Sequence, residues 1–97
     1  MISVRIHTRD GERLLAACDA ELLGRTFKEG EIRLKVSEIF YGGETVSEEA
    51  FRERMKSVTI MNLAGPRTVT MAEEEGYVSA DAVIVIEGIK HAQAVVL

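Results

Sequence analysis

The fold class is indicated first by residues 2–18, which read ISVRIHTRDGERLLAAC. From Ile2 to Ile6, apolar residues alternate with polar ones, which is the period of a strand with one buried face. Asp10-Gly11 supplies a turn, and residues 13–18 are mostly apolar and predict a second strand. The stretch therefore predicts a β-hairpin at the start of the chain.

The rest of the chain mixes helical and strand patterns. A helical apolar stripe after Ser47 runs through Phe51, Met55 and Val58 and reaches Asn62 at the same spacing. The other expected elements are a short helix over 19–24 capped by Asp19, a strand over 32–36, a helix from Gly65-Pro66 to Gly76, and strands over 83–86 and 91–97. We therefore expect an α+β fold in a single compact domain, residues 1–97, with N-terminal strands, a central helical block and a C-terminal strand pair.

The charge distribution limits the classes of partner. The net charge is −4, and the acidic excess lies after residue 35. A protein that tracks phosphates generally carries a strong basic excess, so the composition argues against that class. A local basic patch of Arg5, Arg33 and Lys35 stays open, with Arg13 if its strand register agrees, beside the plain alternative of a solvated sheet face.

The chain carries one cysteine, Cys18, which excludes an internal disulfide and a cysteine-cluster metal site. Arg5 interrupts the N-terminal residues too early for a secretory signal, and no apolar run approaches the roughly 20 residues of a membrane span. We expect a cytoplasmic protein with no membrane contact, no metal and no cofactor.

Phe40-Tyr41-Gly42-Gly43 places two aromatic residues beside a glycine pair, where the backbone can turn and approach another group closely. The run is typical either of a stacking platform for single-stranded RNA or of a strand end whose rings fill the core. We expect Phe40 to fill the core and leave both roles open for Tyr41.

His91-Ala92-Gln93 interrupts an apolar C-terminal stretch with two polar side chains on one face of a strand. Asn62 interrupts an apolar pattern in the same way, either at a helix end or in a pocket shared with His91. Because departures from a local pattern gather at functional or strained sites, we predict that the fold brings Tyr41-Gly42-Gly43, Asn62 and His91–Gln93 together. We further predict that Gly42 or Gly43 allows close approach to the final strand.

A second hypothesis is a small enzyme or metabolite-binding protein that uses Cys18, Asp19 and His91 around a cleft. It requires these three side chains to converge within hydrogen-bond reach. Burial of Cys18 as a small apolar residue is the plain alternative. His7 lies on the polar side of the first strand and is expected at the surface.

Four blocks of sequence also resemble one family. They are Ala16-Ala17-Cys18-Asp19 with Glu21-Leu22-Leu23-Gly24, Phe40-Tyr41-Gly42-Gly43, Asn62-Leu63-x-Gly65, and His91-Ala92-Gln93. In this order they resemble the archaeal family known as domain of unknown function 424. The resemblance implies a small cytoplasmic protein associated with RNA binding or translation, and it carries no catalytic residues.

These observations favour a binding module over an enzyme. The expected site consists of Tyr41, Gly42, Gly43, Asn62, His91 and Gln93. The expected partner is RNA, a translation-related ribonucleoprotein or another protein. Residues 94–97 would pair across a homodimer if they lie at a sheet edge.

Overall fold

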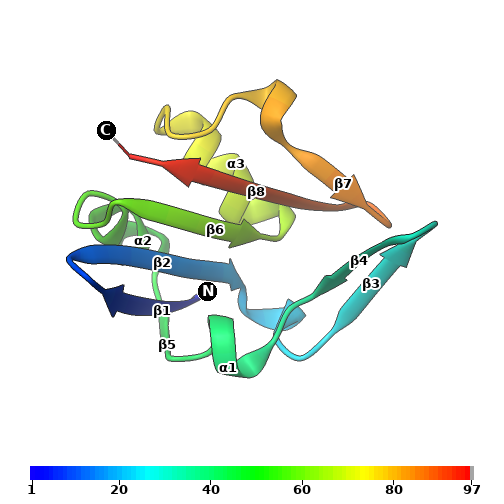
Figure 1. Cartoon of the computed structure of the whole chain (residues 1–97), viewed down its shortest axis with the longest axis horizontal. Helices are drawn as coiled ribbons and strands as arrows, with labels where there is room; N and C mark the ends of the chain where they lie inside the picture. The colour runs from blue at the N-terminus through cyan, green and yellow to red at the C-terminus, as the bar shows by residue number, and fades with distance from the viewer. Residues whose placement is uncertain (97) are drawn as a thin grey trace.

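The structure is a computed structural model and describes residues 1–96 (Figure 1). The strands are β1 (Ile2–Arg9), β2 (Glu12–Asp19), β3 (Thr26–Glu29), β4 (Ile32–Lys35), β5 (Glu44–Val46), β6 (Ile60–Ala64), β7 (Ile84–Ile86) and β8 (Ile89–Val95). The helices are α1 (Glu38–Tyr41), α2 (Glu48–Met55) and α3 (Pro66–Glu74), with single 3-10 turns at Ala20–Leu22 and Ala80–Ala82. The predicted α+β class is confirmed.

Six strands form one sheet in the order β5-β1-β2-β6-β8-β7, and β3 pairs with β4 as a separate two-stranded ribbon. The predicted N-terminal hairpin is present, with β1 and β2 antiparallel from Ile2 opposite Asp19 to Arg9 opposite Glu12. Its turn places Asp10 at φ 51° and Gly11 at φ 83°. Two left-handed residues in a two-residue loop match the twist of a hairpin, which explains the Asp-Gly pair.

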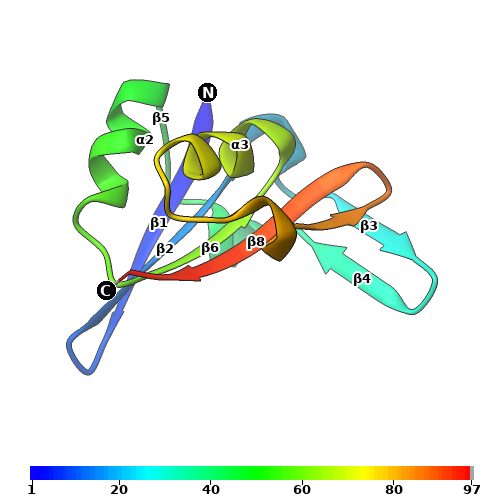
Figure 2. The same ribbon diagram turned by 90° about the horizontal axis from the view of Figure 1, so that it is seen from above.

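The sheet separates two apolar cores. Helices α2 and α3 cover one face (Figure 2), and Phe51 and Met55 of α2 are buried against it with Val69 of α3. The β3–β4 ribbon and α1 cover only part of the other face, where Phe27, Leu34 and Tyr41 are the larger buried residues. Part of that second face therefore has no helix or strand over it.

The expectation that the helix after Ser47 extends to Asn62 is wrong. Helix α2 ends at Met55, and Ile60–Ala64 forms strand β6, which pairs with β2 in parallel. Met61 and Leu63 pack toward the helices, whereas Ala64 belongs to the core on the other face. Because this short strand has apolar residues on both faces, its sequence shows no alternation of apolar and polar residues. Its residues therefore fitted the spacing of the preceding helical stripe.

Smaller boundaries also differ from the prediction. Residues 20–22 form a single 3-10 turn in place of a helix, and strands β3 and β5 were not anticipated. The last strand begins at Ile89 and not at His91, because Glu87-Gly88 alone forms the turn after β7. The predicted start of α3 at Pro66 is confirmed. Leu97, part of the predicted last strand, lies outside the described residues.

Asp19 is a cap, but of a different helix from the one expected. Its Oδ1 accepts hydrogen bonds from Thr68 N (2.8 Å) and Thr68 Oγ1 (2.7 Å), and its Oδ2 accepts one from Arg67 N (3.1 Å). Gly65 has φ 112°, and a Cβ there would meet the Asp19 carboxylate. The end of β2 thus caps α3 from across the parallel β2–β6 pair, where the helix has unsatisfied N–H groups.

We predict that Asp19→Ala lowers the free energy of unfolding by about 2–4 kcal/mol, because it leaves three donors at a buried helix end without their acceptor. Urea unfolding measures the change, and Glu21→Ala serves as the control because Glu21 is an exposed neighbouring carboxylate. Equal urea midpoints for Asp19→Ala and the control would refute the capping role.

Candidate functional site

One face of the sheet, opposite α2 and α3, is only partly covered, and we call its uncovered part the open face. In Figure 1 this face is turned toward the viewer, with the two helices behind the strands. Alternate residues of β1, β2, β6 and β8 line it, namely His7, Leu14, Ile60, Asn62, His91, Gln93 and Val95. All of them are partly or fully accessible to solvent.

Three predicted residues meet at one hydrogen-bonded group on this face. Asn62 Oδ1 accepts a hydrogen bond from the Tyr41 hydroxyl at 2.5 Å and lies 3.2 Å from His91 Nε2. Gln93 lies directly opposite Asn62 in the β6–β8 pair. The spatial prediction is confirmed for Tyr41, Asn62 and His91, and the binding role of these residues stays a prediction.

Three side chains of β1 hold Tyr41 in position. Ser3 Oγ donates to Tyr41 O at 2.9 Å, Arg5 Nη1 to Gly42 O at 3.0 Å, and His7 Nε2 to Phe40 O at 2.8 Å. These carbonyls lie at the end of helix α1, where intrahelical partners run out. Strand β1 therefore fixes the helix whose last residue supplies the Tyr41 hydroxyl.

The glycine pair allows a close approach, but not to the final strand as expected. A Cβ on Gly43 would lie 2.6 Å from Val4 O, and a Cβ on Gly42 would meet Glu38 O. Both glycines thus let α1 and the following residues pack tightly beside β1. Their contribution is to the position of α1, which carries Tyr41.

Phe40 fills the core only in part, and Tyr41, for which both roles were open, is the core ring. Tyr41 is the buried ring, with 3% of its surface exposed, whereas Phe40 is half-buried at the margin of the second core. Phe40 stacks on His7 with ring centroids 4.9 Å apart. His7 is therefore half-buried and bonded, which sequence reasoning missed because its partners lie 33 residues away.

The protonation states follow from burial. Burial raises the pKa of Tyr41, with the nearby Cys18 as a smaller contribution, so the hydroxyl keeps its proton. Burial lowers the pKa of His91 below its usual 6.5, which favours the neutral ring. A neutral His91 that donates from Nε2 to Asn62 leaves Nδ1 as an acceptor. Asn62 Nδ2 and Gln93 have no partner among residues 1–96 and remain available.

An apolar hollow adjoins this polar group. It encloses about 370 Å³ and is lined by His7, Arg9, Asp10, Glu12, Leu14 and Ile60. Val95, directly opposite Ile60 in the β6–β8 pair, is 71% exposed. The open face thus combines polar groups, an apolar hollow and the stacked His7–Phe40 pair.

The Cys18, Asp19 and His91 side chains do not converge, so that prediction is wrong. Cys18 has no exposed surface and lies in the second core, while the adjacent Asp19 caps α3 with its carboxylate. Burial, reinforced by Asp19 and Glu21, raises the pKa of the Cys18 thiol to about 12. This thiol is not an activated nucleophile.

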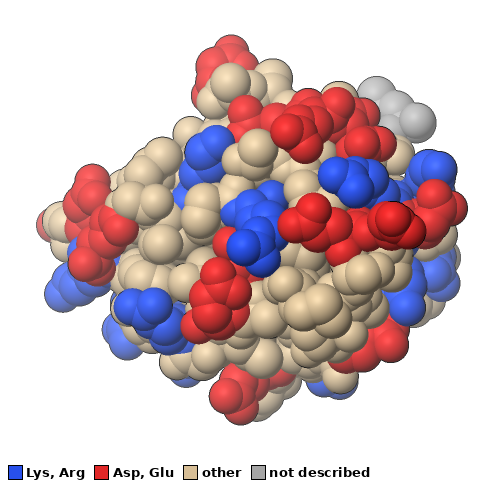
Figure 3. Space-filling view, turned by 180° about the vertical axis from the view of Figure 1, so that it is seen from behind, with Lys and Arg blue, Asp and Glu red and all other residues tan. Residues whose placement is uncertain are grey.

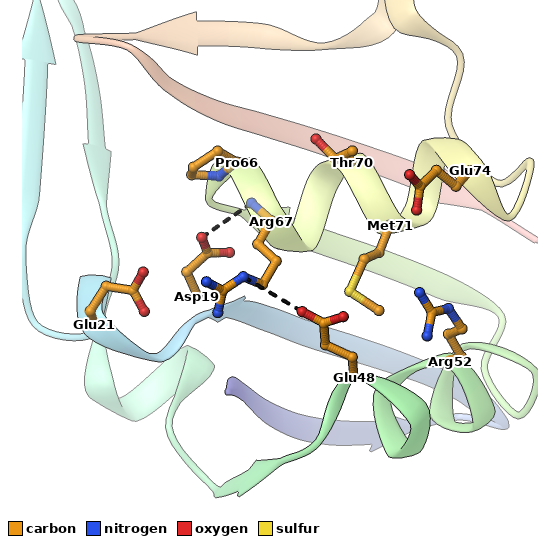
Figure 4. A pocket seen from close by; sticks show the side chains of 9 residues that line it. All are labelled: Asp19, Glu21, Glu48, Arg52, Pro66, Arg67, Thr70, Met71 and Glu74. Atoms are coloured by element: carbon orange, nitrogen blue, oxygen red, sulfur yellow. Dashed lines mark hydrogen bonds and ion pairs between the residues drawn. The ribbon is translucent and has the colours of Figure 1, made fainter.

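A larger hollow of about 490 Å³ lies on the helix side, between α2, α3 and the end of β2 (Figure 4). Its two arginines face carboxylates, with Arg67 Nε 3.6 Å from Glu48 and Arg52 Nε 3.5 Å from Glu75. The N-terminus of α3 is occupied by Asp19. The two arginines and the helix N-terminus at this hollow already have partners within the chain, and Glu21 and Glu74 add negative charge to its lining.

The helix side carries both signs of charge, with acidic and basic side chains interspersed over α2 and α3 (Figure 3). The patch of Arg5, Arg33 and Lys35 with Arg13 does not form. Arg5 is bonded to Gly42, and Arg13 donates to Ser57 O at 2.8 Å on the other side of the hairpin. Arg33 and Lys35 lie on the β3–β4 ribbon.

Among residues 1–96, no group of three or more His, Cys, Asp or Glu side chains is arranged to hold a metal ion. In the same part of the chain, no helix has the length and apolar character needed to cross a membrane.

The fold and the site define a small α+β domain with one partly open sheet face. Residues 7–97 match the family model described as "Protein of unknown function (DUF424)", so the chain belongs to this family and the resemblance is confirmed. A solved structure described as an uncharacterized conserved protein from Methanopyrus kandleri is similar, with 25% identity and a TM-score of 0.82. The match covers 99% of this chain and 91% of that one. No curated protein matches.

We predict that stability falls as the pH is lowered from about 7.5 to about 5. Because the pKa of His91 is lowered by folding, the unfolded chain binds more protons in the interval below 6.5. His91→Gln removes this titration and flattens that part of the pH–stability curve, measured by urea unfolding. His7→Gln is the matched control, and an unchanged curve for His91→Gln would contradict the assignment.

We also predict that Cys18 reacts with a thiol reagent only when the protein opens. Its labelling in native buffer should be slower than in urea by several orders of magnitude, and Asp19→Ala should accelerate it in proportion to lost stability. The absorbance of the thiolate that a chromogenic reagent releases measures the rate of the reaction. Fast labelling of the native protein would restore a chemical role for Cys18.

Proposed function

We propose that the protein is a binding module that holds a short segment of single-stranded RNA on the open face of its sheet. The observation that carries the proposal is that Asn62, His91 and Gln93 share this uncovered face with the hollow at His7, Leu14 and Ile60. Single-stranded RNA is recognised by such surfaces, because its bases stack on aromatic or apolar groups and hydrogen-bond through their edges.

Each group has a separate role in the proposal. Asn62 Nδ2 donates and His91 Nδ1 accepts, while the Gln93 amide can do both. The Tyr41 hydroxyl fixes the orientation of Asn62 and does not contact the ligand, because it is buried and bonded to Asn62 Oδ1. The apolar hollow then takes the face of a neighbouring base. Preorganised donors and acceptors of this kind lower the entropy lost on binding.

Binding is favoured over covalent catalysis by the state of the neighbouring thiol. Cys18 lies on the same side of the sheet as the site but is enclosed by apolar side chains and is held protonated by its raised pKa. The groups that remain accessible on the open face are hydrogen-bonding, aromatic and aliphatic groups. These suit recognition of a ligand and do not include an activated nucleophile.

A protein partner is the second candidate, because apolar side chains are exposed beside the site. Ile84 of β7, directly opposite His91, is 49% exposed, in addition to Val95. Strand β8 lies between β6 and β7, but β7 pairs only with residues 89–91, so among residues 1–96 the outer edge of β8 has no paired strand beyond His91. Pairing of this edge across a homodimer is therefore one form that a protein partner can take.

We predict that Gln93→Glu weakens binding of a fluorescein-labelled single-stranded RNA by roughly ten- to a hundredfold, measured by fluorescence anisotropy. The variant is isosteric but replaces an amide donor with a negative charge on the open face. Because Gln93 is exposed and has no hydrogen-bond partner within residues 1–96, the urea midpoint of the variant should equal that of the wild type.

Ala82→Glu is the matched control, since it adds the same charge at an exposed position on the 3-10 turn before β7. Equal affinities of the two variants would overturn the open-face site. If the chain binds a copurified protein with an affinity that does not change with salt concentration, the protein partner is favoured instead. Sequencing of RNA copurified from native cytoplasm tests the association with translation.

A further inference from the structure

The β3–β4 ribbon carries a cluster of cations that the site described above does not use. Lys28, Arg33 and Lys35 are exposed, whereas Phe27 and Leu34, one residue away along each strand, are buried. Because side chains alternate across a strand, the three cations lie together on the outer face of the ribbon. The inner face packs into the second core.

The register of the ribbon makes this cluster costly for folding. Lys28 lies directly opposite Arg33, and Lys35 lies two residues further along the same strand as Arg33. Like charges directly opposite on one face of a strand pair are destabilising. Folding alone would favour a carboxylate at one of these positions, so the arrangement indicates a requirement outside the fold.

The nearby carboxylates do not neutralise the cluster. Glu87 Oε1 accepts from Lys28 N, and Glu29 Oε1 accepts from Glu87 N at 2.8 Å, which fastens the ribbon to the β7–β8 turn. Within residues 1–96, none of the three cations has a carboxylate oxygen within 4.0 Å, whereas Arg52, Lys56 and Arg67 on the helix side are each paired. The ribbon therefore presents three positive charges that have no ion-pair partner among residues 1–96.

The ribbon also lies on the same side of the sheet as the open face. Its inner residues Phe27 and Leu34 share the second core with Tyr41 and Ala16, and the ribbon extends from that side of the sheet in Figure 2. In Figure 1 the ribbon lies beside the open face and not behind it. A single-stranded RNA bound on the open face could continue onto the ribbon.

We propose that the outer face of the β3–β4 ribbon binds the phosphodiester backbone of the RNA segment whose bases occupy the open face. This inference rests on the proposed function. Lysine and arginine side chains contact phosphate oxygens without reading sequence, so the ribbon supplies affinity and salt dependence. The open face supplies the contacts to bases.

The test compares two triple variants with equal change in net charge. The ribbon variant is Lys28→Gln, Arg33→Gln, Lys35→Gln, and the control is Arg52→Gln, Lys56→Gln, Arg67→Gln. Both are titrated with a labelled single-stranded RNA at several salt concentrations. Three lost phosphate contacts should reduce the slope of log affinity against log salt by about 2, and the affinity at 0.1 M salt by roughly tenfold to a hundredfold.

The ribbon variant should unfold at the same or a higher urea concentration than the wild type, because the repulsion between Lys28 and Arg33 is removed. The single change Lys35→Gln, with an expected slope reduction of about 0.7, keeps the test available if the triple variant folds poorly. An equal loss in the control variant would overturn the ribbon proposal, since it would reflect net charge alone.

The outcomes separate this inference from the proposed function. If the wild type binds RNA and Gln93→Glu weakens it while the ribbon variant keeps its salt slope, the ribbon proposal alone fails. If the wild type binds no RNA but binds poly-glutamate through the ribbon, the partner is an acidic protein segment and both proposals fail.

Discussion

The parallel pairing of β2 with β6 is the constraint on which the rest of the structure depends. Parallel neighbours cannot be joined by a tight turn, so the chain must make a long crossover between them. Here the crossover runs from residue 20 to residue 59 and contains the β3–β4 ribbon, α1, β5 and α2. The open face, the Tyr41 hydroxyl and the ribbon cations are all placed by this one connection.

The same pairing explains how two polar side chains, Asp19 and Asn62, are buried or half-buried and still form hydrogen bonds. At the carboxyl end of the pair, Asp19 meets the first N–H groups of α3 and has only 2% of its surface exposed. On the opposite face of the sheet, Asn62 of β6 accepts the hydrogen bonds of Tyr41 and His91. Asp19 secures the architecture, while Asn62 organises the face that we assign to the ligand.

Some of this arrangement could be read from the sequence. Alternation with Asp10-Gly11 predicted the hairpin, Gly65-Pro66 predicted the start of α3, and breaks in apolar pattern pointed to Tyr41, Asn62 and His91. Strand β6 could not be recognised, because it has apolar residues on both faces and its one polar residue, Asn62, fell at the spacing of the helical stripe. The capping role of Asp19 depends on partners 48 and 49 residues away, which no local pattern contains. The ribbon cations were recognised only in part, because residues 26–29 were not identified as a strand.

The central claim is that the open face, and not the helix side, is the surface that binds RNA. Amide chemical-shift mapping during titration with a short single-stranded RNA tests it most directly, because it locates the contact without a mutation. The account predicts that the shifts concentrate at Asn62, His91 and Gln93 and extend to Lys28, Arg33 and Lys35. Shifts confined to α2 and α3, or no shifts at RNA concentrations well above the protein concentration, would contradict it.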